Sequence, residues 1–364
     1  MFGVFEGAGT HEIEPFMARI DRILAIETSC DDTSVAIVSQ EGWVDACVSA
    51  HQDLAHAPFG GVVPEIASRN HTEAILPLIE TAFAKSGFSW PDIHGLAVTN
   101  RPGLLGSLLV GVVTAKTLAL TKKLPWVGVN HIEGHLLAPL LRETNYAPPK
   151  QFTFPYLALV ISGGHTHLFV VEGIGRYRQV GKTVDDAAGE AFDKFAKLLG
   201  LGYPGGVQVD RLAQKGRVDR YKFPRSMLKE DNLDFSFSGL KTSAQRLLES
   251  LSPEERRAHV SDLCASFQQA IVDVLLGKLE KAMGIYKMNR MVLTGGVSAN
   301  SSLRAQAEQL AARRNWQLAV PPLKYCTDNA AMIGYAGLMR LKRGETSAQD
   351  LGPSPASLEA DFYE

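Results

Sequence analysis

Residues 23–38 read ILAIETSCDDTSVAIV, and this stretch decides the fold. Two short apolar runs flank a polar segment, which predicts a strand, a turn and a second strand. Residues 157–171, LALVISGGHTHLFVV, repeat the pattern. Two similar polar hairpins, one opening each half of the chain, indicate a duplicated domain with a cleft between the copies. An ordinary polar hairpin remains the alternative for the first copy taken alone.

The two turns carry different chemistry. Small hydroxyl and carboxylate residues around Asp31 can meet phosphate oxygens and a magnesium ion. Gly163 and Gly164 let the backbone approach an anion and present N–H groups to it. Each hairpin is therefore expected to supply one side of a phosphate clamp.

Strands and helices alternate through both halves. A long helical stretch is predicted to open at residues 60–65 and to run to about Lys85, and small residues at near-helical spacing predict a close-packed helix from Leu104 to Thr121, with a buried strand between them at residues 96–99. Residues 254–283 are predicted to form an amphipathic helix. Residues 291–294 form another strand, which runs into Gly295-Gly296 and then Asn300. This alternation predicts an α/β fold that binds ligands at the carboxyl ends of its strands.

His131-Ile132-Glu133-Gly134-His135 is the candidate metal motif. Residues i and i+4 of a helix share one face, so the two imidazoles can ligate one divalent ion. Asn130 is a suitable N-cap for such a helix. The alternative is a pair of helix histidines satisfied by hydrogen bonds. Asp328 is the candidate third ligand, since two histidines and one carboxylate suit iron(II) or zinc.

Length, charge and composition restrict the number of domains, the partners and the compartment of the protein. The 364 residues predict two domains. A net charge of −2 gives no global field that would attract nucleic acid. Four widely separated cysteines are typical of reduced thiols in a cytoplasmic protein. No apolar run reaches the roughly 18 residues of a membrane span, and residues 1–18 lack the layout of a signal peptide.

Two charged segments in the second half have open interpretations. Asp193 is expected on a helix, either accepting hydrogen bonds from a ribose or lying on the surface. Residues 211–229 hold seven Lys/Arg and one acidic residue, with Tyr221 and Phe223 between them. Such a segment suits a phosphate backbone, with aromatic rings available for stacking, and a solvated basic face is the alternative.

Taken together, these segments resemble one family, that of the universal tRNA N6-adenosine threonylcarbamoyltransferases in their bacterial TsaD type, formerly described as O-sialoglycoprotein endopeptidases. The match runs from about Ile23 to about Arg343. The motifs that carry it are residues 27–33, 60–65, 131–135, 162–166, 185–194, 235–241, 295–300 and 326–329.

The resemblance implies two duplicated α/β domains of the actin/Hsp70/sugar-kinase (ASKHA, RNase H-like) type with a nucleotide cleft between them. Residues 1–20 would be an N-terminal extension and 344–364 a C-terminal tail. The first domain would span residues 21–130, completed by the helix 328–343, and the second would span residues 131–327.

The resemblance also implies the site residues. The metal ligands would be His131, His135 and Asp328, and Asp31 would be catalytic. The substrate nucleotide would contact Val160, Ile161, Ser162, Gly163, Gly164, Asp193, Gly206, Asp210 and Asn300. One divalent metal per subunit is expected, with iron(II) favoured over zinc, together with an adenine nucleotide (threonylcarbamoyl-AMP or ATP).

The implied reaction moves a threonylcarbamoyl group from threonylcarbamoyl-AMP to the N6 amine of the adenosine 3′ of the anticodon, in tRNAs that read codons beginning with A. Expected partners are tRNA, a paralogous subunit of the TsaB type and a small ATPase of the TsaE type, with no membrane. The alternatives are a sugar-kinase-like phosphotransferase and a non-catalytic scaffold. A metallopeptidase is least favoured, because Glu133 lies on the wrong face to be the base of a His-Glu-x-x-His motif.

Two features depart from the family pattern. Asn100-Arg101 stands where smaller residues are usual, which predicts an altered loop and an added cation beside the cleft. The N-terminal extension is also atypical and receives no role.

Overall fold

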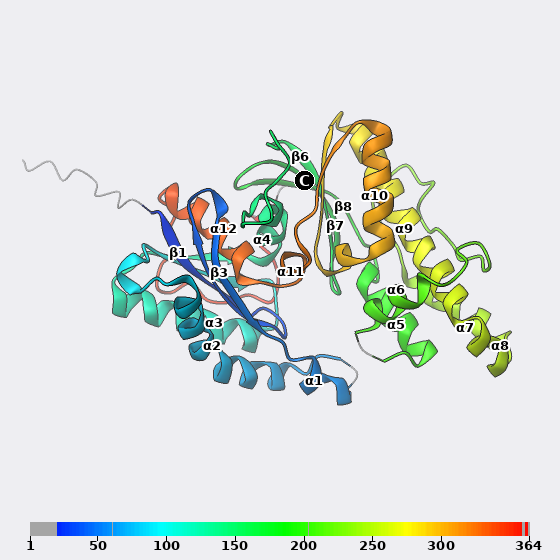
Figure 1. The fold of residues 1–364 in the computed structure, drawn as a ribbon, viewed down its shortest axis with the longest axis horizontal. Coiled ribbons are helices and arrows are strands. Elements are labelled where there is room, and N and C mark those ends of the chain that lie inside the picture. The colour runs from blue at the N-terminus through cyan, green and yellow to red at the C-terminus, as the bar shows by residue number, and fades with distance from the viewer. Residues whose placement is uncertain (1–19, 60, 203, 359–360, 363–364) are drawn as a thin grey trace, which may run out of the picture.

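The computed structural model describes residues 20–59, 61–202, 204–358 and 361–362. Of the predicted N-terminal extension only Ile20 is described, so that prediction lies almost wholly outside the described residues. Two five-stranded sheets occupy separate halves of the molecule, with the short helix α4 (His131–Leu137) between them (Figure 1).

The two sheets have the same topology. The first has the order β3-β2-β1-β4-β5 and the second the order β8-β7-β6-β9-β10. In each, the first three strands form antiparallel pairs and the last two join in parallel. The strands are β1 (Arg22–Glu27), β2 (Thr33–Ser39), β3 (Val44–Ala50), β4 (Leu96–Arg101), β5 (Trp126–Asn130), β6 (Tyr156–Ile161), β7 (Thr166–Gly173), β8 (Arg176–Lys182), β9 (Arg290–Thr294) and β10 (Gln317–Ala319). The duplication predicted from the two hairpins is confirmed.

The α-helices are not evenly spread along the chain, because α5 to α9 run in succession between β8 and β9. They are α1 (Asp53–His56), α2 (Pro64–Ser86), α3 (Leu105–Lys122), α4, α5 (Ala188–Leu199), α6 (Gly205–Ala213), α7 (Ser238–Glu249), α8 (Pro253–Ala258), α9 (Val260–Ile285), α10 (Ser301–Arg314), α11 (Leu323–Cys326) and α12 (Ala330–Lys342). The single amphipathic helix predicted over residues 254–283 is two helices, which meet at His259. The last helix starts at Ala330, so Asp328 precedes it.

Alternate residues of β1 face opposite layers, as the period of a strand requires. Leu24 and Ile26 pack with residues of α2 and α3, whereas Ile23 and Ala25 pack with α12. The C-terminal helix α12 thus returns to the first sheet and covers one of its faces (Figure 1). The same core extends through α4 to Tyr156, Ala158 and Val160 of the second sheet.

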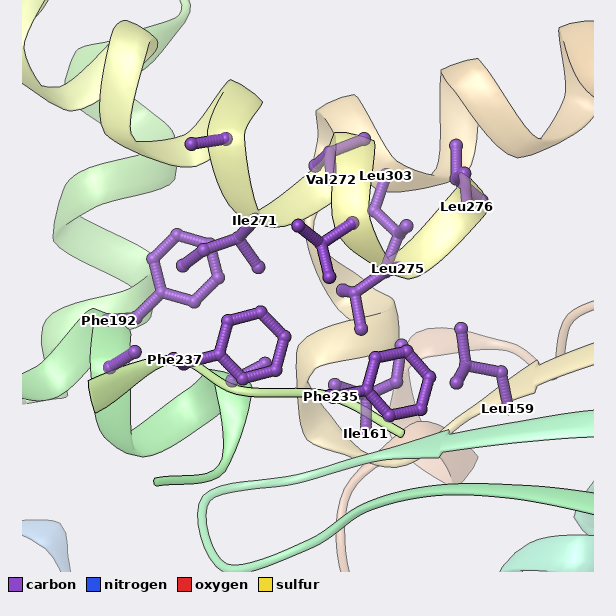
Figure 2. Packing of buried hydrophobic residues seen from close by; sticks show 14 of the residues in the cluster. Leu159, Ile161, Phe192, Phe235, Phe237, Ile271, Val272, Leu275, Leu276 and Leu303 are labelled. Carbon is purple, nitrogen blue, oxygen red and sulfur yellow. The ribbon is translucent and has the colours of Figure 1, made fainter. Parts of the chain in front are cut away.

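The other face of the second sheet buries an aromatic core. Figure 2 shows Phe235 and Phe237 beside the β6 residues Leu159 and Ile161 and the α9 residues Ile271 and Leu275. All of these side chains are fully buried. This core fixes β6, and therefore fixes the glycine turn that follows it.

Helix α3 is long and apolar enough to cross a membrane by length and composition alone, and it is the one such helix among the described residues. The prediction of no such segment missed it, because Lys116 and several threonines interrupt the run. A single such helix is weak evidence. Gly111 lies against Thr28, where a Cβ would come within 2.4 Å of the Thr28 hydroxyl, so α3 is closely packed on the first sheet.

Candidate functional site

Three side chains converge between the two sheets. His131 and His135 lie on α4, whose first turn is capped by the Asn130 side chain accepting from the Ile132 amide at 2.8 Å. Oδ1 of Asp328 lies 3.3 Å from Nε2 of both histidines. The three candidate ligand atoms lie within 4.8 Å of one another. The structure therefore brings together residues separated by almost 200 positions.

A second set of polar groups holds His131 from the other side. Its Nδ1 lies 3.2 Å from Oε2 of Glu27 and 3.1 Å from the Ser29 hydroxyl. Glu27 also accepts from the Thr99 hydroxyl and the Ser29 amide. A carboxylate on the far nitrogen of a histidine fixes the ring tautomer and leaves Nε2 for a metal.

The electrostatics of the cluster depend on its burial. Although burial raises the pKa of Asp328, the charge of His131 and hydrogen bonds from both histidines hold it well below the usual range. Burial lowers the pKa of His131, but the carboxylates of Asp328 and Glu27 outweigh it and raise this pKa well above normal. Burial and the neighbouring His131 lower the pKa of His135. An ionised Asp328 and a neutral His135 are the forms that bind cations.

The donor set fits a metal. Within the described part of the chain, Nδ1 of the buried His135 has no hydrogen-bond partner. Buried polar atoms without partners are rare, and their presence calls for an explanation such as an ion. Two imidazoles and one carboxylate are ligands typical of zinc and of non-haem iron(II).

Glu133 points away from this cluster. It accepts from the Tyr177 hydroxyl at 3.0 Å and lies 3.6 Å from the Arg340 guanidinium. Burial raises the pKa of Glu133. Its side chain is thus part of the support of α4, in agreement with the prediction that it is no peptidase base.

A cavity of about 600 Å³ lies between the two halves, and its lining includes Thr327, the residue before Asp328, but none of the three candidate ligands. Its lining includes Asp31, Gly163, Asp193, Gly206, Asp210 and Asn300, all singled out from the sequence. Ser162 and Gly164 flank Gly163 but are not in the lining. Val160 and Ile161 are fully buried in β6, whose backbone pairs with β7 and β9, and neither residue lines the cavity.

Polar residues on the second wall are already engaged within the protein. Asp193 accepts from the Gly205 and Gly206 amides at the start of α6, at 2.9 and 3.3 Å. Burial raises the pKa of Asp193. Asp210 accepts from the amide and hydroxyl of Ser301, and Asn300 caps α10. These side chains fix two helix starts at the rim of the cavity.

The glycine turn is open on the side of the cavity and closed behind. A Cβ on Gly163 or Gly164 would meet nothing within 4 Å. Behind the turn, Gly189 of α5 is so close that its Cβ would lie 2.5 Å from the Ser162 carbonyl oxygen. The start of α5 thus supports the turn from below.

The wall formed by the first half includes residues that sequence reasoning missed. Asp32, His51 and Asp53 line the cavity beside Asp31. Asp32 lies 2.9 Å from Nδ1 of His51, and burial raises the pKa of Asp32 to about 7. Asp32 was visible in the hairpin turn, but no local pattern connected it with His51 on the far end of β3.

Two further predictions from the sequence are wrong, one about Phe223 and one about Arg101. Phe223 is buried against Phe267 and is not available for base stacking, although six of the seven basic residues in 211–229 are exposed. Arg101 is not a cation beside the cleft. Its guanidinium forms a bidentate pair with Asp361 of the C-terminal tail, and both side chains are largely buried. The altered residues Asn100-Arg101 extend β4 and anchor the tail.

The fold and the site together define a two-domain protein of the actin/Hsp70/sugar-kinase type with a cluster compatible with a metal site beside its cleft. Solved structures agree on the fold. HypF in its phosphate- and nucleotide-bound form has a TM-score of 0.58 and 13% identity, covering 91% of this chain and 48% of its own. Component A of the Acidaminococcus fermentans (R)-2-hydroxyglutaryl-CoA dehydratase has a TM-score of 0.52 and 13% identity, covering 88% and 98%.

Sequence comparisons give the family. The family model described as "TsaD: tRNA N6-adenosine threonylcarbamoyltransferase" matches residues 44–335. A protein with the same enzyme name from Bdellovibrio bacteriovorus is 60% identical over 343 residues, covering 94% of this chain and 99% of its own. Another, from Trichlorobacter lovleyi, is 52% identical over 322 residues, covering 88% and 92%. This chain belongs to the tRNA N6-adenosine threonylcarbamoyltransferase family.

The predicted function is thereby confirmed: the protein is a transferase of N6-threonylcarbamoyladenosine tRNA modification, and tRNA is its substrate. The kinase, scaffold and peptidase alternatives are not favoured.

Proposed function

We propose that His131, His135 and Asp328 bind one divalent metal, with iron(II) favoured and zinc also compatible. The single observation that carries this proposal is the approach of the Asp328 carboxylate to both imidazoles at 3.3 Å. Glu27 supports it, because it occupies the far nitrogen of His131. When bound, such a metal polarises a carbonyl oxygen or holds a carboxylate and hydroxyl of the substrate.

The cleft is the proposed site of threonylcarbamoyl-AMP. We assign its adenylate to the wall formed by the second domain, where the exposed Gly163-Gly164 turn can offer backbone N–H groups and Gly206 at the start of α6 lines the cavity. Asp193, Asp210 and Asn300 hold the helix starts around it. The dimensions agree, because a cavity of about 600 Å³ is in the usual range for a ligand of this size.

The reaction then follows from the chemistry of the two substrates. The N6 nitrogen of adenosine forms a bond to the carbamoyl carbon, and the bond from that carbon to the phosphate oxygen breaks. AMP leaves with the electron pair, and the nitrogen loses one proton. Adenine's amine is a poor nucleophile, so orientation and charge stabilisation must supply most of the rate. Asp31 is the carboxylate that we assign to catalysis on the facing wall.

Family membership supports four further proposals. The acceptor is the adenosine 3′ of the anticodon in tRNAs reading codons that begin with A. The protein works with a paralogous TsaB-type subunit and a TsaE-type ATPase. It acts in the cytoplasm. Its two domains comprise residues 21–130 with 328–343, and residues 131–327.

The test combines metal analysis of the purified protein with a nucleoside assay of tRNA that has reacted in the presence of both partner proteins. His131→Ala and Asp328→Ala are expected to lose bound metal and most of the transfer. His94→Asn is the matched control, because His94 is a half-buried histidine of the first domain whose ring accepts from the backbone amides of Asp21 and Arg22. Parental metal content and transfer in both ligand variants would refute the assignment.

A further inference from the structure

The described residues of the C-terminal tail, 344–358 and 361–362, lie along the first sheet and reach the metal helix. After α12 the tail's backbone and side chains bond in turn to Trp126 and Gly128 of β5, to Lys116 of α3, and to Asn100 near the end of β4 and Gly103 just after that strand. Its later residues 361–362 then enter the space beside α4. Residues 344–364 lie beyond the part of the chain that matches the family model.

Asp361 bonds to the side chains that end β4 and β5. Its carboxylate accepts from the Arg101 guanidinium and from Nδ2 of Asn130 at 2.8 Å, and its side chain is only 6% exposed. Asn130 is the residue whose Oδ1 caps α4 immediately before His131. One amide side chain therefore connects the start of the metal helix to the tail.

Phe362 reaches the same helix from its other side. Its ring packs against Phe169 of β7 and Tyr177 of β8, with centroids 4.9 and 6.4 Å apart. The hydroxyl of Tyr177 donates to Glu133, which lies between the two histidines in the sequence. Asp361 thus bonds to the first domain, and Phe362 packs on the second.

We propose that the tail is a strap that positions α4, with Asp361 and Phe362 as positioning residues for the metal cluster. This inference rests on the metal site proposed above. The groups that orient a ligand helix control how well its imidazoles meet the ion, and loss of such outer contacts commonly lowers metal affinity by about 10- to 100-fold. The strap connects the two domains at α4, because Asp361 bonds to the first domain and Phe362 packs on the second.

Cobalt(II) is a suitable probe, because its visible absorption reports ligand geometry directly. The full-length Asp361→Ala and Phe362→Ala proteins would be titrated with cobalt alongside the parent. We expect cobalt affinity to fall by about 10- to 100-fold in Asp361→Ala and less in Phe362→Ala, with an altered spectrum. Asp361→Glu, which keeps the charge, is expected to recover part of the affinity.

Asp350→Ala is the matched control, since Asp350 is an exposed acid on the same tail with no hydrogen bond or ion pair to the described residues. In the transfer assay, the strap variants should lower kcat more than they raise KM for tRNA. Should Asp361→Ala not fold, Asp361→Asn retains the shape of the side chain and answers the same question.

The two levels of the proposal fail in different ways. If the parent and His131→Ala bind cobalt equally, the metal site itself is wrong. If His131→Ala loses cobalt while folded Asp361 and Phe362 variants bind it like the parent, the metal site stands and the strap is refuted.

Discussion

Glu27 and His131 face each other at 3.2 Å across the boundary between the first sheet and the metal helix. Glu27 ends β1, and His131 begins α4, so one contact sets the distance between these elements. Glu27→Gln removes the negative charge beside Nδ1 of His131, which favours metal binding through Nε2 of the same ring. We expect divalent metal affinity to fall by about 10- to 100-fold while the fold is kept, as measured by competition with a chromogenic chelator.

Glu254→Gln is the control for this change, since Glu254 belongs to an exposed pair with Arg257 and contributes little. Equal metal affinity in the Glu27 variant and the parent would show that Glu27 does not act on the site.

Asp32 is expected to make stability depend on pH. Its pKa of about 7 means that the folded protein keeps this proton where the unfolded chain, with a pKa near 3.8, has released it. The folded state then binds more protons between these values, so stability falls as pH rises from 4 to 7 and levels off above 7. Asp32→Asn removes this pH-dependent loss. We expect the free energy of unfolding of the variant to exceed that of the parent by about 1–3 kcal/mol at pH 8 but to differ little at pH 4.

Denaturant unfolding of both proteins at pH 4, 5, 6, 7 and 8 measures the difference in their free energies of unfolding. Parallel curves for Asp32→Asn and the parent would contradict the prediction. The same variant is expected to transfer more slowly, because Asp32 and His51 line the cleft.

Gly189 and Gly163 should respond oppositely to a methyl group. At Gly189 a Cβ would press on the Ser162 carbonyl, so Gly189→Ala is expected to cost about 1–3 kcal/mol and displace the turn. At Gly163 a Cβ meets open space, so Gly163→Ala should leave stability nearly unchanged while raising KM for threonylcarbamoyl-AMP. Thermal unfolding and steady-state kinetics separate the two effects. A Gly163→Ala protein with parental KM would exclude that wall as the adenylate site.

The basic segment is expected to contact tRNA. Lys215, Lys222 and Lys229 are exposed and have no acidic partner among the described residues, whereas Arg220 and Arg225 pair with Asp262 and Asp273. Replacing the three lysines by alanine should weaken tRNA binding and reduce the salt slope by up to about one unit per lysine. Filter binding at several salt concentrations tests this. Lys85, Lys150 and Lys342, exposed elsewhere, form the control triple, and an unchanged slope in the test triple would refute the contact.

Local patterns predicted most of the fold. The apolar runs around Asp31 and Gly163 gave both hairpins, and the small residues of α3 indicated its close packing. The same reasoning joined two helices at His259, because amphipathic periodicity continues across the break. The domain boundaries and the roles of the site residues stay predictions.

Contacts between distant segments explain what the sequence did not reveal. The i, i+4 spacing of His131 and His135 is a local signal, but the approach of Asp328 depends on the return of α12 to the first sheet. His51 and Asp361 carried no signal, since their partners Asp32 and Arg101 are fixed only by the folded chain. Arg101 looked like a free cation because its counter-charge lies 260 residues later.

The shared topology of the two sheets gives the cleft a polarity. Equivalent turns lie on its two walls, yet one places the carboxylates of Asp31 and Asp32 in the lining and the other places Gly163, which has no side chain. An elongated molecule with one anionic end has a single favourable direction between such walls, because reversing it would set phosphate against carboxylate. Duplication followed by divergence of one turn is thus sufficient to orient a substrate head to tail.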